Sequence, residues 1–296
     1  METTFSILIP HKNRPQLLER AIHSVPKRDD VQIIVVDDNS DPEIVDFECF
    51  PCIGEENVEI YLTKEGKGAG YARNVGLPHV KGKWLLCLDS DDYFTDEMPA
   101  LMDKVADRDE DVIFFESTAI KEPSMMPSTR GESNNEQVEN ALATGDYSEL
   151  FLLSHDAMKF YSADFIREHS ISFHEVRWGN DVWFTACVAK YARTYTAFTS
   201  KAYCITESDY SLVATKSLES SLCRLEEESM AAALLRHKFK NRSLQLWLVE
   251  RWKEVWKLSM KDGLRTFPKT LIHGGSRMIP YFLCFFEHLL KAKIRG

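Results

Sequence analysis

Three carboxylates stand within four positions of the chain, at Asp89, Asp91 and Asp92. They directly follow the apolar run Trp84–Leu88, which is typical of a buried strand that ends at a loop. Carboxylates this close repel one another unless a cation or protons neutralise them. Aspartate oxygens with open positions suit Mg²⁺ or Mn²⁺ holding a diphosphate. An acidic, solvated turn would contain the same residues, so the rest of the chain has to decide between the two interpretations.

Strands and helices alternate through the region that contains this motif. The expected strands are Phe5–Pro10, Val31–Val36, Val58–Leu62, Trp84–Leu88 and Val112–Phe115, and the expected helices are Gln16–Val25 and Tyr71–Leu77. This alternation predicts a mostly parallel sheet with helices on both faces. Ligands bind at the carboxyl ends of strands in such sheets, so three polar segments are expected to meet there. These segments are Pro10–Arg14, Asp37–Asp41 and Asp89–Asp92.

A glycine-rich loop, with Gly66, Gly68 and Gly70, precedes the second helix. The spacing of these glycines does not fit a dinucleotide-binding fingerprint. The loop also comes two strands too late in the chain, because that fingerprint follows the first strand. The glycines still allow the backbone to approach a phosphate or a sugar, and Arg73 supplies a nearby cation.

The later part of this region is less regular. Lys121–Asn140 is polar and is expected to be a mobile loop or insertion. Ordered structure is expected to resume at Ala157–Tyr161, followed by an apolar helix over Trp178–Tyr191 and a strand at Ala202–Ile205. Asp181, at the start of that helix, is either a functional carboxylate or a residue that complements the helix dipole.

Charge is distributed unevenly along the 296 residues, whose net charge is −10. From Arg236 onward there are 14 Lys/Arg and four Asp/Glu, whereas the preceding residues hold 22 and 42. A basic tail suggests an anionic partner. Helices are expected at Leu218–Phe239, Leu244–Trp256 and Met278–Leu290, the last too short to span a bilayer. These helices either lie in a membrane interface or pack on the core.

Cysteine usage and the start of the chain bear on the compartment. The seven cysteines are an odd number, and the only close pair is Cys49-x-x-Cys52, without a second pair to complete a zinc site. No signal peptide is expected, because a strand follows Met1 within a few residues. Together these features predict a reducing, cytoplasmic location.

Four motifs, in order and spacing, resemble glycosyltransferase family two, the inverting enzymes with the nucleotide-sugar-binding GT-A fold. They are Ser6–Pro10, Val35–Ser40, Gly70–Gly76 and Leu88–Asp92. The resemblance covers about residues 4–210. It implies an α/β GT-A catalytic domain over 1–212, with a nucleotide-sugar half at about 1–118 and an acceptor half at about 145–212. Residues 213–296 would then form a basic helical extension, suited to a membrane surface.

The resemblance also implies roles for individual residues. Asp181 would be the general base, Asp91 the ligand of Mn²⁺ or Mg²⁺, and Asp38 the acceptor of the uracil imide N–H. The other residues expected to bind the nucleotide sugar are Pro10, Arg14, Gly68, Arg73, Asp89 and Asp92, and those on the acceptor side are Lys159, Trp178 and Asn180. Asn180 departs from the family, which has Glu at that position.

The activity implied is metal-dependent transfer from a UDP-sugar to a lipid-diphosphate-linked or oligosaccharide acceptor, in capsule or O-antigen assembly. The enzyme would be peripheral at the inner face of the plasma membrane, with no nucleic-acid partner. A non-catalytic nucleotide-sugar-binding scaffold is the alternative. A nucleotidyltransferase is disfavoured because the glycine- and arginine-rich N-terminal signature of those enzymes is absent.

Overall fold

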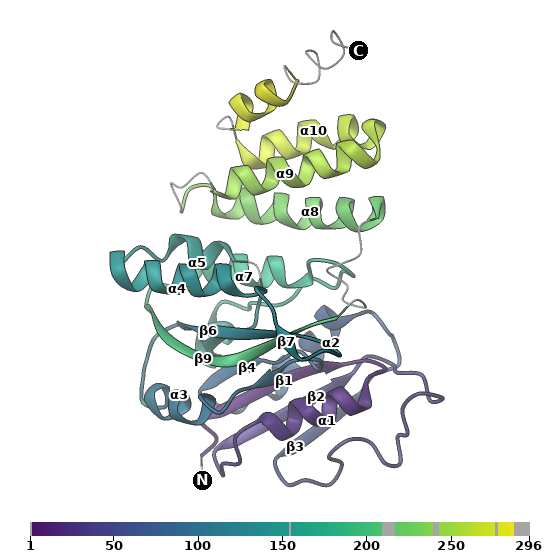
Figure 1. Cartoon of the computed structure of the whole chain (residues 1–296), viewed down its shortest axis with the longest axis vertical. Helices are drawn as coiled ribbons and strands as arrows, with labels where there is room; N and C mark the ends of the chain where they lie inside the picture. The colour runs from purple at the N-terminus through teal and green to yellow at the C-terminus, as the bar shows by residue number, and fades with distance from the viewer. Residues whose placement is uncertain (1, 154, 209–216, 239–242, 276–277, 287–296) are drawn as a thin grey trace. The chain divides into compact units, whose positions relative to one another are not determined.

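The computed structural model describes residues 2–153, 155–208, 217–238, 243–275 and 278–286. The chain divides into two compact units, Met1–Ser211 and Leu212–Gly296 (Figure 1). The strands of the first unit are β1 (Phe5–His11), β2 (Val31–Asp37), β3 (Val58–Leu62), β4 (Trp84–Cys87), β5 (Tyr93–Phe94), β6 (Val112–Lys121), β7 (Met126–Pro127), β8 (Lys159–Ser162) and β9 (Tyr195–Glu207). Its helices are α1 (Pro15–Ser24), α2 (Ala69–Gly76), α3 (Met98–Val105), α4 (Glu132–Thr144), α5 (Ser148–Leu152), α6 (Ala163–Glu168) and α7 (Asn180–Tyr191), with a 3₁₀ turn at Leu77–His79.

The strands form one nine-stranded sheet in the order β3-β2-β1-β4-β8-β6-β9-β5, with β7 paired to the last two residues of β6. The first four strands of this order are parallel to one another. Every residue of β1, β2 and β4 is buried, which is why these strands appear in the sequence as continuous apolar runs. Because they are parallel, their carboxyl ends meet at one edge of the sheet.

Helices cover both faces of the sheet (Figure 1). Helices α1 and α3 bury Leu18, Ile22 and Leu101 in one core with the strands. On the other face, Phe184 of α7 packs edge-on against Tyr161 of β8, with ring centroids 5.2 Å apart. The predicted α/β fold with helices on both faces is confirmed.

The expected loop at Lys121–Asn140 is wrong. Strand β6 continues to Lys121, a short hairpin to β7 follows, and helix α4 begins at Glu132. The helix buries only Asn134, Val138 and Ala141, so it has no apolar stripe and its polar surface resembled a loop. The expected strand at Ala202–Ile205 is present but longer, because β9 pairs along almost the whole of β6.

The second unit contains α8 (Leu218–Leu235), α9 (Ser243–Leu258) and α10 (Met260–Gly274), with further helical backbone at 279–286. Its core is built around Trp252, which is fully buried and donates its indole N–H to the carbonyl of Gly263 at 2.9 Å. The ends of two expected helices, Phe239 and 287–290, lie outside the described residues. None of the described helices has the length and apolar character to cross a bilayer.

Candidate active site at the carboxyl edge of the sheet

The ends of β1 and β2 are joined by a buried hydrogen-bond network. His11 donates from Nδ1 to Asp37 Oδ2 at 2.8 Å, since its Nε2 accepts from the backbone N–H of Arg14 at 3.1 Å. Ser40 donates to Asp37 from both its backbone and its hydroxyl. Burial opposes ionisation of Asp37, but the donors His11 and Ser40 outweigh it and lower the pKa of this carboxyl. The network therefore fixes the loop that carries Asp38.

Asp38 faces the glycine-rich loop and keeps one acceptor atom without a partner. Its Oδ2 accepts from the backbone N–H of Gly68 at 2.8 Å and lies 3.4 Å from the ammonium of Lys12. Its Oδ1 is buried and has no hydrogen bond. Gly68 has φ +99°, a conformation that glycine adopts without strain. A buried, unsatisfied carboxylate oxygen is costly, so this atom is suited to accept from a ligand N–H.

The three carboxylates after β4 lie together, as the sequence predicts. Asp89, Asp91 and Asp92 each place a carboxylate oxygen within 4.8 Å of the others. Burial raises the pKa of Asp89 to about 6; Arg73 opposes this shift, and the charges of Asp156 and Asp91 add to it. Burial and the repulsion from Asp89 and Asp91 raise the pKa of Asp92 well above its ordinary value. All-oxygen donors that repel one another fit a divalent cation such as Mg²⁺ or Mn²⁺.

The three carboxylates differ in how they are held. Asp92 is buried and accepts from the Tyr203 hydroxyl and the Thr206 backbone N–H, both at 2.7 Å, which anchors the motif to β9. Asp91 is more exposed than Asp92, and its Oδ2 pairs with the Arg14 guanidinium at 3.0 Å. Its partner Arg14 is partly exposed, whereas the Arg73 that holds Asp89 is buried, so Asp91 is the member most easily turned toward a cation.

A buried guanidinium connects this motif to the start of α7. Arg73 lies 2.6 Å from Asp89 Oδ1 and donates to Asn180 Oδ1 at 3.0 Å. Its Nε is 2.8 Å from Asp156 Oδ2, an ion pair in which the N–H is not aligned for a hydrogen bond. Its charged plane also lies 5.2 Å from the ring centre of Phe173. Arg73 thus fixes the distance between the acidic motif and the α7 terminus.

Asp181 stands in the first turn of α7, directly after Asn180. Burial, together with the charge of Asp156, raises the pKa of Asp181 to about 7, although Arg73 opposes the shift. Helix α2 also approaches the segment that precedes α7 closely, because a Cβ at Gly70 would lie 2.2 Å from the carbonyl oxygen of His174. This close contact supports the position of the α7 terminus. Asp181 is therefore a carboxyl that titrates near neutral pH beside the acidic motif.

The two remaining acceptor-side residues are buried. Lys159 donates to the carbonyl of His155, and burial lowers its pKa to about 8, with Asp156 and Asp181 opposing the shift. Trp178 is buried in the segment that leads into α7. Lys159 is therefore a buried ammonium that interacts electrostatically with Asp156 and Asp181.

A second group of side chains with metal-binding chemistry lies outside this site. His23 Nε2 is 3.7 Å from Cys52 Sγ and 4.0 Å from Glu55 Oε1. Burial and the neighbouring Glu55 raise the pKa of the Cys52 thiol to about 12. Cys49 and Cys52 are both free thiols.

The sequence interpretation missed several residues of the network. Asp156 was not singled out, because it follows no strand and belongs to no motif, and its contact with Arg73 is what reveals it. Arg20 of α1 donates to the Asp91 carbonyl, a contact that helix periodicity does not indicate. His11 and Lys12 lay within a polar segment that was expected at this edge, and that was the one available signal.

A family model described as Glycosyl transferase family 2 matches residues 6–156, which include both strand-end motifs, the glycine loop, the acidic triad and Asp156. The chain belongs to glycosyl transferase family 2. As a member of this family it is a glycosyltransferase, which confirms the predicted enzyme class.

The names of two curated relatives of this family 2 member state both a sugar and an acceptor. The poly(ribitol-phosphate) beta-N-acetylglucosaminyltransferase TarS of Staphylococcus aureus is 26% identical over 208 residues, covering 67% of this chain and 35% of TarS. The GalNAc(5)-diNAcBac-PP-undecaprenol beta-1,3-glucosyltransferase of Campylobacter jejuni is 33% identical over 90 residues, 29% of each chain. The aligned segments cover 13% to 38% of the lengths of the curated relatives.

The crystal structure of S. aureus TarS 1–349 in complex with UDP-GlcNAc is similar over 92% of this chain and 79% of that one. Its TM-score is 0.63 and its sequence identity is 20%. At this identity the likeness concerns the fold, and it confirms the predicted GT-A fold of this family 2 member.

Proposed function

We propose that this glycosyltransferase transfers a sugar from a UDP-sugar to a hydroxyl of a saccharide acceptor, with inversion and with a divalent metal. The observation that carries the proposal is the buried guanidinium of Arg73, which contacts Asp89 of the acidic motif and Asn180 beside Asp181. A cation site and a carboxyl that titrates near neutral pH are thereby held in one rigid arrangement.

The donor side is supported by Asp38 and its neighbours. The unpartnered Asp38 Oδ1 accepts the imide N–H of uracil, a donor that cytosine does not present at the same position. Pro10 and Arg14 line the same end of the sheet. Gly68, without a side chain, leaves the backbone open to the sugar or diphosphate. The related TarS was crystallised in complex with UDP-GlcNAc, which agrees with a UDP-sugar donor.

The acidic motif fits the metal. Asp91 ligates Mn²⁺ or Mg²⁺, while Asp92 anchors the motif to β9 and Asp89, held by Arg73, faces the donor. The ion supplies charge stabilisation for the departing diphosphate. Binding it favours the ionised form of Asp89 and Asp92, whose pKa values are otherwise raised by burial and repulsion.

Asp181 is proposed as the general base. An acceptor hydroxyl hardly ionises at neutral pH, so a carboxylate within hydrogen-bond reach is needed to take its proton. Burial has brought the pKa of Asp181 to about 7, which makes it a stronger proton acceptor than an exposed aspartate. One base and attack opposite the leaving group invert the anomeric configuration. The neighbouring Asn180 is uncharged, so Asp181 is the one acidic residue in the first turn of α7.

The acceptor is proposed to be a lipid-diphosphate-linked or oligosaccharide chain in surface polysaccharide assembly. Two relatives support this class, since their names refer to a PP-undecaprenol saccharide and to poly(ribitol-phosphate). We further propose a peripheral location at the cytoplasmic face of the plasma membrane, because basic residues accumulate after Arg236.

A donor screen tests the proposal. The full chain is incubated with Mn²⁺ and a panel of UDP-sugars, with UDP-galactose, UDP-glucose and their N-acetyl forms first, and both slow hydrolysis and thermal protection are measured. Metal-dependent hydrolysis of one donor that disappears in Asp91→Ala is expected. Protection by a UDP-sugar without hydrolysis or transfer under any condition would instead favour a nucleotide-sugar-binding scaffold.

A further inference from the structure

Helix α10 has an exposed face that combines apolar and basic side chains. Met260, Leu264 and Ile272 are 62%, 56% and 68% exposed and stand at intervals of four or eight residues, so they share one side of the helix. Pro268 fills the remaining position of the same row. Single exposed apolar residues are ordinary, but an aligned row of them is not.

A row of cations runs beside the apolar row. Lys261, Arg265 and Lys269 are exposed and again four residues apart. The one acidic residue of α10, Asp262, is partly buried and is hydrogen-bonded to the Ser259 hydroxyl at its N-cap. Arg265 pairs with this Asp262, and Lys269 pairs with the exposed Glu226 of α8, so these two carboxylates offset part of the positive charge of the face.

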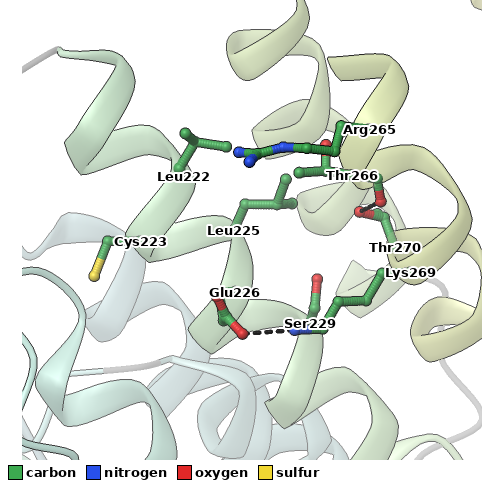
Figure 2. Close-up of a pocket in the computed structure, with 9 residues that line it drawn as sticks. All are labelled: Leu222, Cys223, Leu225, Glu226, Ser229, Arg265, Thr266, Lys269 and Thr270. Carbon is green, nitrogen blue, oxygen red and sulfur yellow. Dashed lines mark hydrogen bonds and ion pairs between the residues drawn. The ribbon is translucent and has the colours of Figure 1, made fainter. Parts of the chain in front are cut away.

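Two of these cations also border a pocket between α8 and α10 (Figure 2). The pocket has a volume of about 360 Å³ and is lined by Leu222, Cys223, Leu225, Glu226, Ser229, Arg265, Thr266, Lys269 and Thr270. In Figure 2 the Arg265 side chain extends across from α10 toward Leu222, and Lys269 pairs with Glu226. An apolar wall beside a guanidinium suits a ligand that has an anionic head and an apolar body.

We infer that the α10 face docks on an anionic phospholipid surface, and that the pocket takes the phosphate of a lipid headgroup beside Arg265. The apolar row enters the interface between headgroups and acyl chains, and the cations contact lipid phosphates. The ion pairs of Arg265 with Asp262 and of Lys269 with Glu226 involve exposed cations, and such pairs exchange readily for other anions. This assignment rests on the proposed membrane location and adds the surface and the lipid charge that would serve it.

Vesicle sedimentation with the full chain tests the assignment. Vesicles of phosphatidylcholine alone are compared with vesicles in which about one-third of the lipid is phosphatidylglycerol, at low salt and at about 0.5 M KCl. Binding to the anionic vesicles at low salt, and its loss in high salt or on neutral vesicles, is expected. Arg265→Gln/Lys269→Gln should weaken partitioning about 25-fold, because each cation near an anionic surface contributes about 5-fold.

Matched variants separate the face from general effects. Leu264→Ser/Ile272→Ser should reduce binding by at least about 10-fold through lost apolar burial. Met125→Ser/Met126→Ser, which alters two exposed apolar residues of the first unit, should bind like the wild type. Lys27→Gln/Lys104→Gln, which removes two cations elsewhere, should do the same. Unchanged thermal melting of all four variants shows that they are folded.

Three results would overturn the assignment. They are wild-type protein that stays in the supernatant with anionic vesicles at low salt, α10 variants that sediment like the wild type, and a dimer by light scattering that Leu264→Ser/Ile272→Ser abolishes. The last result would mean that a second copy covers the face. Sedimentation needs neither donor nor metal, so its failure leaves the proposed transferase chemistry intact, and loss of activity in Asp91→Ala leaves sedimentation unchanged.

Discussion

Replacing Asp181 by Asn removes the proposed base while keeping nearly the same shape. Because the pKa of Asp181 is about 7, the carboxyl is about 10% ionised at pH 6 and about 90% at pH 8. Wild-type kcat/KM should therefore rise about 10-fold over this interval, with unit slope on the acidic side. Asp181→Asn should lower kcat/KM by about 10²- to 10⁴-fold at pH 8, and its residual rate should lack this acidic limb.

The assay measures initial transfer rates at saturating metal in overlapping buffers from about pH 5.5 to about pH 9, with the donor identified by the screen and an oligosaccharide or lipid-diphosphate-linked acceptor. Asp109→Asn is the matched control, since its side chain is almost fully exposed and pairs with Lys83 at the surface. It should retain both the rate and the pH profile. Asp181→Asn with more than about one-third of the wild-type rate at pH 8, or with the same acidic limb, would refute the assignment of the base.

Three further outcomes follow from the same geometry. Asp181→Asn should raise the thermal midpoint more at pH 8 than at pH 5. A carboxyl whose pKa is raised by folding destabilises the folded protein increasingly as the pH rises toward 7, and the amide removes this effect. An equal shift at both pH values in a melting experiment would contradict this. Asp38→Asn should weaken UDP binding by about 10- to 100-fold in calorimetry through loss of a charged acceptor, and unchanged affinity would mean that uracil binds elsewhere. Gly70→Ala should lower both the melting temperature and kcat, since its Cβ would meet the His174 carbonyl at 2.2 Å, and an unaffected variant would show that the α2 contact is dispensable.

The strand-end motifs, and the edge at which they meet, could be predicted without coordinates. Asp37, Asp38 and Asp89 follow apolar runs, and the carboxyl ends of parallel strands share one edge, so their proximity follows from pattern alone. The family resemblance extended this to Asp181, which has no strand signal and lies about 90 residues beyond the acidic motif along the chain. Local periodicity failed at α4, since a helix with few buried positions lacks an apolar stripe.

The residues that shift the pKa of the site carboxyls could be identified only from the tertiary structure. The pKa of Asp181 depends on its burial and on Asp156 and Arg73, residues that are distant in sequence and that no motif connects to it. Burial and electrostatic shifts depend on the sum of the surrounding atoms in space, which spacing along the chain does not encode. The exposed basic face of α10 is a similar case. Its composition can be read along the chain, but packing around Trp252 determines which side of the helix stays in contact with solvent.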